Sequence, residues 1–181
     1  MRGGWRHWTG GSLTTPRRLR SRGGLKVTPL PLFHGGDYIS LGFAFGEDTG
    51  EFVYLSDVSS VPGRTMAVLR RQPIRTLVVD CLHRKPYFSH FSLGDAVDLV
   101  RELRPQRALL VGMTCSLGRH DDVCLELARL RAAEGLDVQL ARDGLWVEMD
   151  EGAVRGARAG AHPPGQREGL LERLRASWRG H

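Results

Sequence analysis

The sequence predicts an α/β fold in which helices flank a mixed β-sheet. Two continuous apolar runs, RTLVVDC at 75–81 and RALLVGM at 107–113, are typical of strands in a sheet that is covered on both faces. The segment between them, SHFSLGDAVDLVRELRP at 89–105, has the periodicity and the end signals of an amphipathic helix. A chain of 181 residues has room for one ordinary domain with tails.

The amino-terminal part is expected to become ordered only after a basic leader. Residues 1–24 are rich in Gly and Arg and have no hydrophobic periodicity, so we predict a disordered segment. The next stretch, LKVTPLPL at 25–32, is predicted to be extended because Pro29 and Pro31 disfavour a helix. His34 follows it at a glycine-rich turn.

A β-hairpin is the next predicted unit. The runs SLGFAFG at 40–46 and EFVYLSD at 51–57 are rich in strand-forming residues and are separated by a short turn sequence. This pairing places Asp57 at the end of the second strand. A helix is then expected over 62–72, with Pro62 in its first turn.

The clearest helix signal lies after the first buried strand. Ser92 is expected to be the N-cap, Asp95 completes a capping box three residues later, and Pro105 follows the end of the helix. The strand at 107–113 leads through a Cys/Ser/Gly loop to a third helix over about 120–134.

The last predicted elements are two short strands. DVQLA at 137–141 and GLWVEMD at 144–150 are expected to form a terminal hairpin. Residues 151–181 are rich in Gly, Ala and Pro, which favours a flexible tail in which REGLLERLRASW has the spacing of a short helix. The folded region is therefore expected to span 25–150.

The formal net charge of +6 is unevenly distributed along the chain. Residues 1–26 carry seven Lys/Arg and no acid, whereas 27–150 carry 13 basic and 17 acidic residues. Because the region expected to fold is acidic, a specific nucleic-acid partner is not expected. No apolar run reaches the length of a membrane span and the first residues lack a signal-peptide core, so a membrane protein is not expected either.

Cysteine usage and the leader bear on the cellular compartment. The three cysteines form no CxxC pair, which favours a reducing compartment, and we expect the protein in the cytoplasm. The leader is rich in Arg and free of acids, so mitochondrial import is the alternative.

Three residues carry the main chemical hypotheses. His34 and Asp57 are expected at two neighbouring strand ends, and an imidazole with a carboxylate suits a Zn or Mn site. The alternative is a solvated histidine beside an aspartate that caps a turn or helix. His90 lies just before the capped helix, where it is placed to act as a general acid or electrostatic stabiliser, or else packs between Phe88 and Phe91.

Two further residues have chemical alternatives. Asp80, at the end of a predicted strand, is placed to orient a histidine or simply to end the strand. Cys115, in GMTCSLGRHDD, would be a nucleophile if His120 or a helix N-terminus activated its thiol. A thiol-dependent hydrolase is thus one hypothesis, and it predicts inactivation by alkylation but not by chelation.

Four segments in order resemble the C-terminal half of a metallo-β-lactamase-fold hydrolase. They are VTPLPLFHG, the hairpin from LGFAFG to EFVYLSDVSSVP, LVVDCLHRKPYFSHFSL, and RALLVGMTCSL. Phosphonate-pathway cyclic phosphodiesterases and their uncharacterised relatives are the most similar members. The resemblance covers about 25–149 and implies a partial αββα sandwich, mostly its C-terminal half.

The resemblance also implies a site and an activity. His34 matches a metal-binding histidine, Asp57 an aspartate that bridges two metal ions, and His90 a histidine near the substrate phosphate. The cofactor implied is two ions of Zn or Mn. The reaction implied is metal-dependent hydrolysis of a small phosphodiester or related ester.

The sequence departs from the family at two places. The main metal-binding string of the family, HxHxDH, is absent, and Gly112 and Cys115 stand where the family has the two histidines of an LTHxSH segment. We therefore expect a truncated chain that retains part of the site. The alternative function is a non-catalytic pseudoenzyme or interaction module, whose exposed sheet face binds a partner protein or a second copy.

Overall fold

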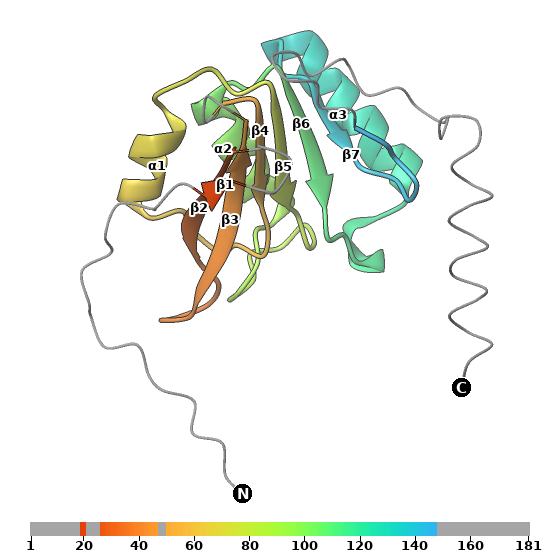
Figure 1. Cartoon of the computed structure of the whole chain (residues 1–181). Helices are drawn as coiled ribbons and strands as arrows, with labels where there is room; N and C mark the ends of the chain where they lie inside the picture. The colour runs from red at the N-terminus through yellow and green to blue at the C-terminus, as the bar shows by residue number, and fades with distance from the viewer. Residues whose placement is uncertain (1–18, 21–25, 47–49, 148–181) are drawn as a thin grey trace, which may run out of the picture.

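The computed structural model describes residues 19–20, 26–46 and 50–147 of the chain. The strands are β1 (Leu19–Arg20), β2 (Lys26–Phe33), β3 (Ile39–Phe45), β4 (Phe52–Leu55), β5 (Thr76–Asp80), β6 (Arg107–Val111) and β7 (Val138–Leu140) (Figure 1). The helices are α1 (Gly63–Leu69), α2 (Leu93–Leu103) and α3 (His120–Glu134), with a 3₁₀ turn, η1, at Cys115–Leu117. The predicted C-terminal tail and most of the predicted leader lie outside the described residues.

The seven strands form one mixed sheet whose spatial order is the order of the chain, β1 to β7. The strands from β1 to β4 pair antiparallel, and those from β4 to β7 pair parallel. The predicted hairpin is confirmed, because β3 and β4 are antiparallel neighbours with Phe43 opposite Tyr54. The predicted mixed sheet is confirmed as well.

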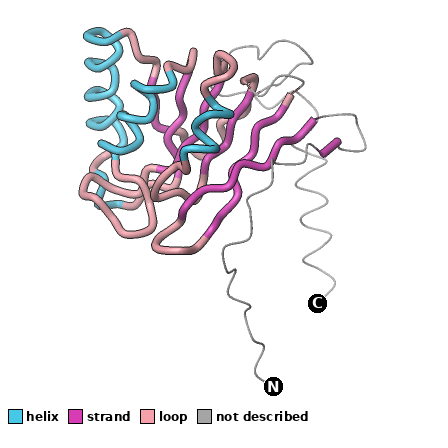
Figure 2. Tube along the Cα trace, turned by 90° about the vertical axis from the view of Figure 1, so that its left-hand side faces the viewer, coloured by secondary structure: helices cyan, strands magenta, loops and turns pink. Residues whose placement is uncertain are grey.

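The helices α1, α2 and α3 lie on the same side of the sheet (Figure 2). Side chains that alternate along the strands point into this layer, among them the fully buried Leu30, Val53, Leu77 and Leu110. They form one core with helix residues such as Val100. One helical layer on one sheet corresponds to half of an αββα sandwich.

The helix ends follow local sequence signals. Ser92 caps α2 by accepting a hydrogen bond from the Asp95 N–H, and the Asp95 carboxylate accepts in return from the Ser92 N–H, so the predicted capping box is present. The predicted start and end of α3 agree with the structure. By contrast α1 ends at Leu69, earlier than predicted, and Pro73 disfavours helical backbone in the residue before it.

Two sequence predictions differ from the structure. β1 lies inside the segment expected to be disordered, because its backbone pairs with the edge of β2 and pairs Leu19 with Val27. The predicted terminal hairpin is wrong for the described residues, since β7 pairs only with β6 and residues 145–147 form no strand. The alternating pattern there reflects only a local preference and does not establish a partner strand. The remainder of that predicted strand, 148–150, lies outside the description.

The sheet face away from the helices carries a row of aromatic side chains on β3 and β4. The Phe43 and Phe45 rings have centroids 6.2 Å apart, and Phe45 meets Phe52 at 5.9 Å. Tyr54 and Leu41 on the same face are exposed. We call Leu41, Phe43, Phe45, Phe52 and Tyr54 the aromatic face.

Within the described residues, no helix combines the length and the apolar character that crossing a bilayer requires.

Candidate metal centre

Three strands deliver polar side chains to one edge of the sheet. β2 and β4 are each antiparallel to β3, and β5 is parallel to β4, so β2, β4 and β5 all point the same way. Their carboxyl ends therefore meet at the same edge. His34 follows β2, Asp57 comes two residues after β4, and Asp80 is the last residue of β5.

Backbone hydrogen bonds hold the segments after β2 and β4 together. The Phe33 N–H donates to the Ser60 carbonyl at 3.0 Å, and the Ser59 N–H donates to the Phe33 carbonyl at 2.7 Å. The Ser40 hydroxyl donates to the Asp57 carbonyl at 2.6 Å. These contacts bring Asp57 beside His34, although β3 separates β2 from β4 in the sheet.

The turn after His34 depends on glycine. Gly35 has a φ of +75°, which favours glycine, and a Cβ at this position would lie 2.7 Å from the Phe88 ring. The Phe88 side chain therefore lies directly over this turn. The loop that precedes α2 thus contacts the loop that carries His34.

The loop that carries His90 is closed at its base. The Leu82 N–H donates to the Phe91 carbonyl and the Leu93 N–H donates to the His83 carbonyl, both at 2.9 Å. His90 then lies two residues before the N-cap of α2, so the helix fixes the end of this loop.

These segments bring His34, Asp57 and His90 together. Each offers one ligand atom, and the three atoms lie within 4.8 Å of one another. The His34 Nε2 is 3.9 Å from the Asp57 Oδ2, and the two imidazole rings meet nearly at right angles with centroids 4.7 Å apart. Two nitrogen donors and one carboxylate are a donor set that suits a transition-metal cation such as Zn²⁺. The residues present thus fit the metal that the sequence predicts.

Every member of this group makes a supporting hydrogen bond. The His34 Nδ1 is 2.7 Å from the Ser89 carbonyl, which accepts only, so this nitrogen carries the hydrogen. The His90 Nδ1 is 2.6 Å from the Asp80 Oδ2. The Ser56 hydroxyl donates to the Asp57 Oδ1 at 2.9 Å.

Asp80 is the buried polar residue beneath the site. Its side chain is 1% exposed, and its Oδ2 also accepts a hydrogen bond from the Val58 N–H at 3.2 Å. Burial raises the pKa of Asp80 above its ordinary value, although the hydrogen bonds from His90 and Val58 oppose the shift. Its Oδ1 is buried without a hydrogen-bond partner among the described residues, and it faces Gly112, where a Cβ would lie only 2.8 Å away.

The structure decides three of the alternatives that the sequence left open. His90 does not pack between two phenylalanines, because Phe88 is exposed and the His90 ring meets His34. Asp80 does contact a histidine, as one alternative predicted. His120 lies against Cys124, with its Nδ1 3.4 Å from the sulfur, rather than against Cys115.

Sequence reasoning missed the supports from Ser89 and Ser56. Ser89 acts through its backbone carbonyl, which any residue supplies, so no sequence signal marks it. Ser56 precedes Asp57 directly, and a hydroxyl next to a candidate ligand is a weak signal that sequence alone offers.

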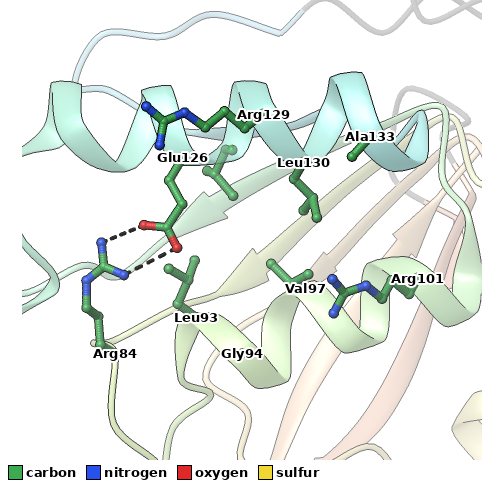
Figure 3. Close-up of a pocket in the computed structure, with 10 residues that line it drawn as sticks. Arg84, Leu93, Gly94, Val97, Arg101, Glu126, Arg129, Leu130 and Ala133 are labelled. Carbon is green, nitrogen blue, oxygen red and sulfur yellow. Dashed lines mark hydrogen bonds and ion pairs between the residues drawn. The ribbon is translucent and has the colours of Figure 1, made fainter.

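A second concave region lies between α2 and α3. Its volume is about 480 Å³, and Leu93, Val97, Leu127 and Leu130 supply much of its wall (Figure 3). Arg84 at one end forms a two-point ion pair with Glu126, which Figure 3 marks with dashed lines. No residue of the metal-ligand group lines this groove, which we call the α2/α3 groove.

Comparison with known proteins identifies relatives of the chain. The model of the family described as the beta-lactamase superfamily domain matches residues 7–113. The match begins upstream of residue 25, where the resemblance in sequence was expected to begin. No curated protein matches the sequence significantly.

Solved structures agree with the family match. A protein described as a new diphosphatase from the PhnP family has a TM-score of 0.59 and 28% identity, with 71% of this chain and 44% of that chain covered. The metallo-beta-lactamase fold protein YhfI from Bacillus subtilis has a TM-score of 0.54 and 17% identity, with 74% and 53% covered. The short form of human tRNase Z has a TM-score of 0.50 and 19% identity, with 71% and 45% covered. The last two show the fold alone, and the chain spans about half the length of each of these structures.

Proposed function

We propose a function for this chain from the premise that it belongs to the beta-lactamase superfamily. Its fold is the metallo-β-lactamase fold, it is PhnP-like, and its relatives include hydrolases. We propose that it carries part of the active site of a metal-dependent hydrolase that acts on a phosphodiester or a related phosphoric ester. The convergence of His34, Asp57 and His90 at one sheet edge is the observation that supports this most strongly.

The proposed site leaves room for a substrate. The His34 and His90 side chains are 23% and 21% exposed, and the Asp57 side chain is 55% exposed, so the group opens to solvent. A divalent cation held by His34 and Asp57 would polarise a phosphoryl oxygen and lower the pKa of water. His90, whose ring centroid is 4.7 Å from that of His34, would be placed to contact a bound phosphoryl group. We propose Zn or Mn as the cation.

Exposed aromatic side chains near the site favour a substrate with a planar group. The Tyr87 ring is 6.3 Å from the His90 ring, and the Tyr38 ring is 5.8 Å from the His34 ring. Both tyrosines are more than half exposed. Stacking on such rings would favour a phosphodiester that carries an aromatic ring or nucleobase over one that carries an alkyl chain.

Hydrolysis of bis(p-nitrophenyl) phosphate tests the proposal directly. The purified chain, supplied with Zn or Mn, is expected to release p-nitrophenol, and a chelator is expected to abolish the release. His34→Ala and Asp57→Asn should each lose this activity, whereas His120→Ala should keep it. Absence of turnover with either metal would contradict the proposed activity of this chain.

The aromatic face favours a second candidate function. Five apolar side chains line up on β3 and β4, and the exposed members Leu41 and Tyr54 are 49% and 37% exposed. We propose that a second copy of the chain covers this face, in the manner of two sheets packed face to face. Analytical ultracentrifugation should show a dimer that Tyr54→Lys converts to a monomer. A wild-type monomer at every concentration would exclude this candidate.

The cytoplasm is the compartment we propose for this activity, with the mitochondrion as the alternative. Imaging of a tagged chain distinguishes the two.

A further inference from the structure

Both histidines of the site present the same nitrogen to its centre. The His34 Nδ1 is committed to the Ser89 carbonyl, so the lone pair of the neutral imidazole lies on Nε2, which faces Asp57. The His90 Nδ1 is engaged by the Asp80 Oδ2 at 2.6 Å, which leaves Nε2 as the ring nitrogen available to a cation. An imidazole held in this way by a carbonyl or carboxylate is the usual arrangement of a metal-binding histidine.

Asp57 likewise uses one carboxylate oxygen for a supporting hydrogen bond and directs the other toward the centre of the site. The Asp57 Oδ1 accepts a hydrogen bond from the Ser56 hydroxyl, which leaves Oδ2 directed toward His34. All three side chains therefore use one polar atom for support and present the other to a common point.

We propose that His34, Asp57 and His90 form one three-ligand site for a single divalent cation such as Zn²⁺, with Asp80 as the positioning residue for His90. This inference rests on the proposed function, because both place a metal at this edge, but it makes His90 a ligand. Three protein ligands with an open position are the usual composition of a catalytic zinc site.

The distances agree with such a site after a small adjustment. Zinc-to-ligand distances near 2 Å place the atoms of a tetrahedral site about 3.3 Å apart. The His34 Nε2 and the Asp57 Oδ2 are 3.9 Å apart, and all three ligand atoms lie within 4.8 Å. Movements of about 1 Å, within the reach of side-chain rotation, would close the group around one cation. The Asp57 side chain is 55% exposed, so a cation held here would remain accessible to water or substrate.

Asp80 is built to hold His90 and not to bind the cation itself. Its Oδ2 takes hydrogen bonds from both the Val58 N–H and the His90 ring, and its side chain is 1% exposed. It does not belong to the group of candidate ligands. Loss of such a supporting carboxylate typically weakens metal binding about 10- to 100-fold.

Direct measurement of metal binding tests the inference without an activity assay. The full chain is stripped with a chelator and titrated with Zn²⁺ by calorimetry and with Co²⁺ by visible absorption. We expect one ion per chain. Asp80→Asn should weaken binding about 10- to 100-fold, and His90→Gln should weaken it more. His120→Ala, whose histidine lies against Cys124, should bind as the wild type does.

X-ray absorption of the zinc-loaded chain counts the imidazole ligands. Two imidazoles in the wild type and one in His90→Gln would support the inference, and the wild-type count does not depend on how well a variant folds. A wild-type count of one, or His90→Gln binding as tightly as the wild type, would overturn it. Tight three-ligand binding without hydrolysis would contradict only the proposed function, and hydrolysis with unchanged binding in His90→Gln would contradict only this inference.

Discussion

The metal-ligand edge and the α2/α3 groove differ in what their polar atoms face. In the groove Arg84 pairs with Glu126, and Arg101 with Glu134, so charges cancel over an apolar wall. At the edge, each of His34, Asp57 and His90 has one supported polar atom and one that faces its neighbours. The groove therefore presents paired charges over an apolar wall, whereas the edge presents converging ligand atoms.

The largest expected effect concerns the reactivity of a thiol that is buried beneath the metal-ligand edge. Burial raises the pKa of Cys81, which follows Asp80, from an ordinary value near 9 to about 12, and the Asp80 charge adds to the shift. At pH 8 the thiolate fraction then falls roughly a thousand-fold, because each unit is a factor of ten. We expect iodoacetamide to alkylate the exposed Cys115 rapidly and Cys81 far more slowly, as measured by peptide mass spectrometry.

The same labelling tests the thiol-dependent hypothesis. Alkylation of Cys115 should leave metal-dependent hydrolysis unchanged, since the candidate ligand group contains no cysteine. Loss of hydrolysis after alkylation, with zinc affinity intact, would favour Cys115 as a nucleophile. Equal labelling of Cys81 and Cys115 would show that the region beneath the metal-ligand edge is open to solvent.

Removal of a groove side chain should affect stability but not metal binding. Leu127 is 2% exposed and contributes both to the groove wall and to the core. Leu127→Ala is expected to lower the free energy of unfolding by about 2–5 kcal/mol, since it leaves a cavity. Urea denaturation measures the loss, and zinc calorimetry on the folded variant should match the wild type. A change in zinc affinity would mean that the two regions are coupled.

Two glycines with nearly equal backbone angles provide a matched pair. Gly112 has a φ of +78° with Asp80 Oδ1 in the path of a Cβ, and Gly144 has a φ of +79° with nothing within 4 Å. Both alanine variants should lose about 1–2 kcal/mol of stability, because the left-handed conformation disfavours a side chain. Only Gly112→Ala should also weaken zinc binding, since the added Cβ would displace Asp80, which holds His90. Equal zinc affinity in the two variants would show that Asp80 does not contribute to metal binding.

The smallest effect is expected at the rim of the groove. The side chains of Arg84 and Glu126 are 45% and 50% exposed, and exposed ion pairs contribute about 0–1 kcal/mol. Glu126→Gln should therefore change the urea midpoint very little and leave zinc binding unaltered. A large loss of stability would show that this pair contributes more than an exposed pair normally does.

Much of the fold could be predicted because local signals determine it. The capping box at Ser92 fixes the start of α2, and the continuous apolar run of β5 is buried along its whole length. The terminal hairpin is wrong for the described residues because residues 145–147 form no strand, and local alternation does not show whether a segment finds a partner strand. β1 was missed for the same reason.

The candidate site could be predicted only in part. His34, Asp57 and His90 were each recognisable by residue type and position, yet nothing in the sequence shows that all three share one centre. The contacts that bring them together, such as those between Phe33 and Ser60, involve the backbone, which carries no residue signature. Whether His90 binds the cation depends on these contacts and not on sequence spacing.

The order of the strands has a consequence for how the chain is made. Each strand pairs with its predecessor in the chain, so no pairing depends on a distant segment. All the ligands and their supports lie between His34 and His90, whereas α3 and β7 come later. Because the amino-terminal part leaves the ribosome first, the nascent chain presents every ligand before its last helix and strand exist. The candidate ligands and the residues that support them are therefore all synthesised before the last part of the helical layer.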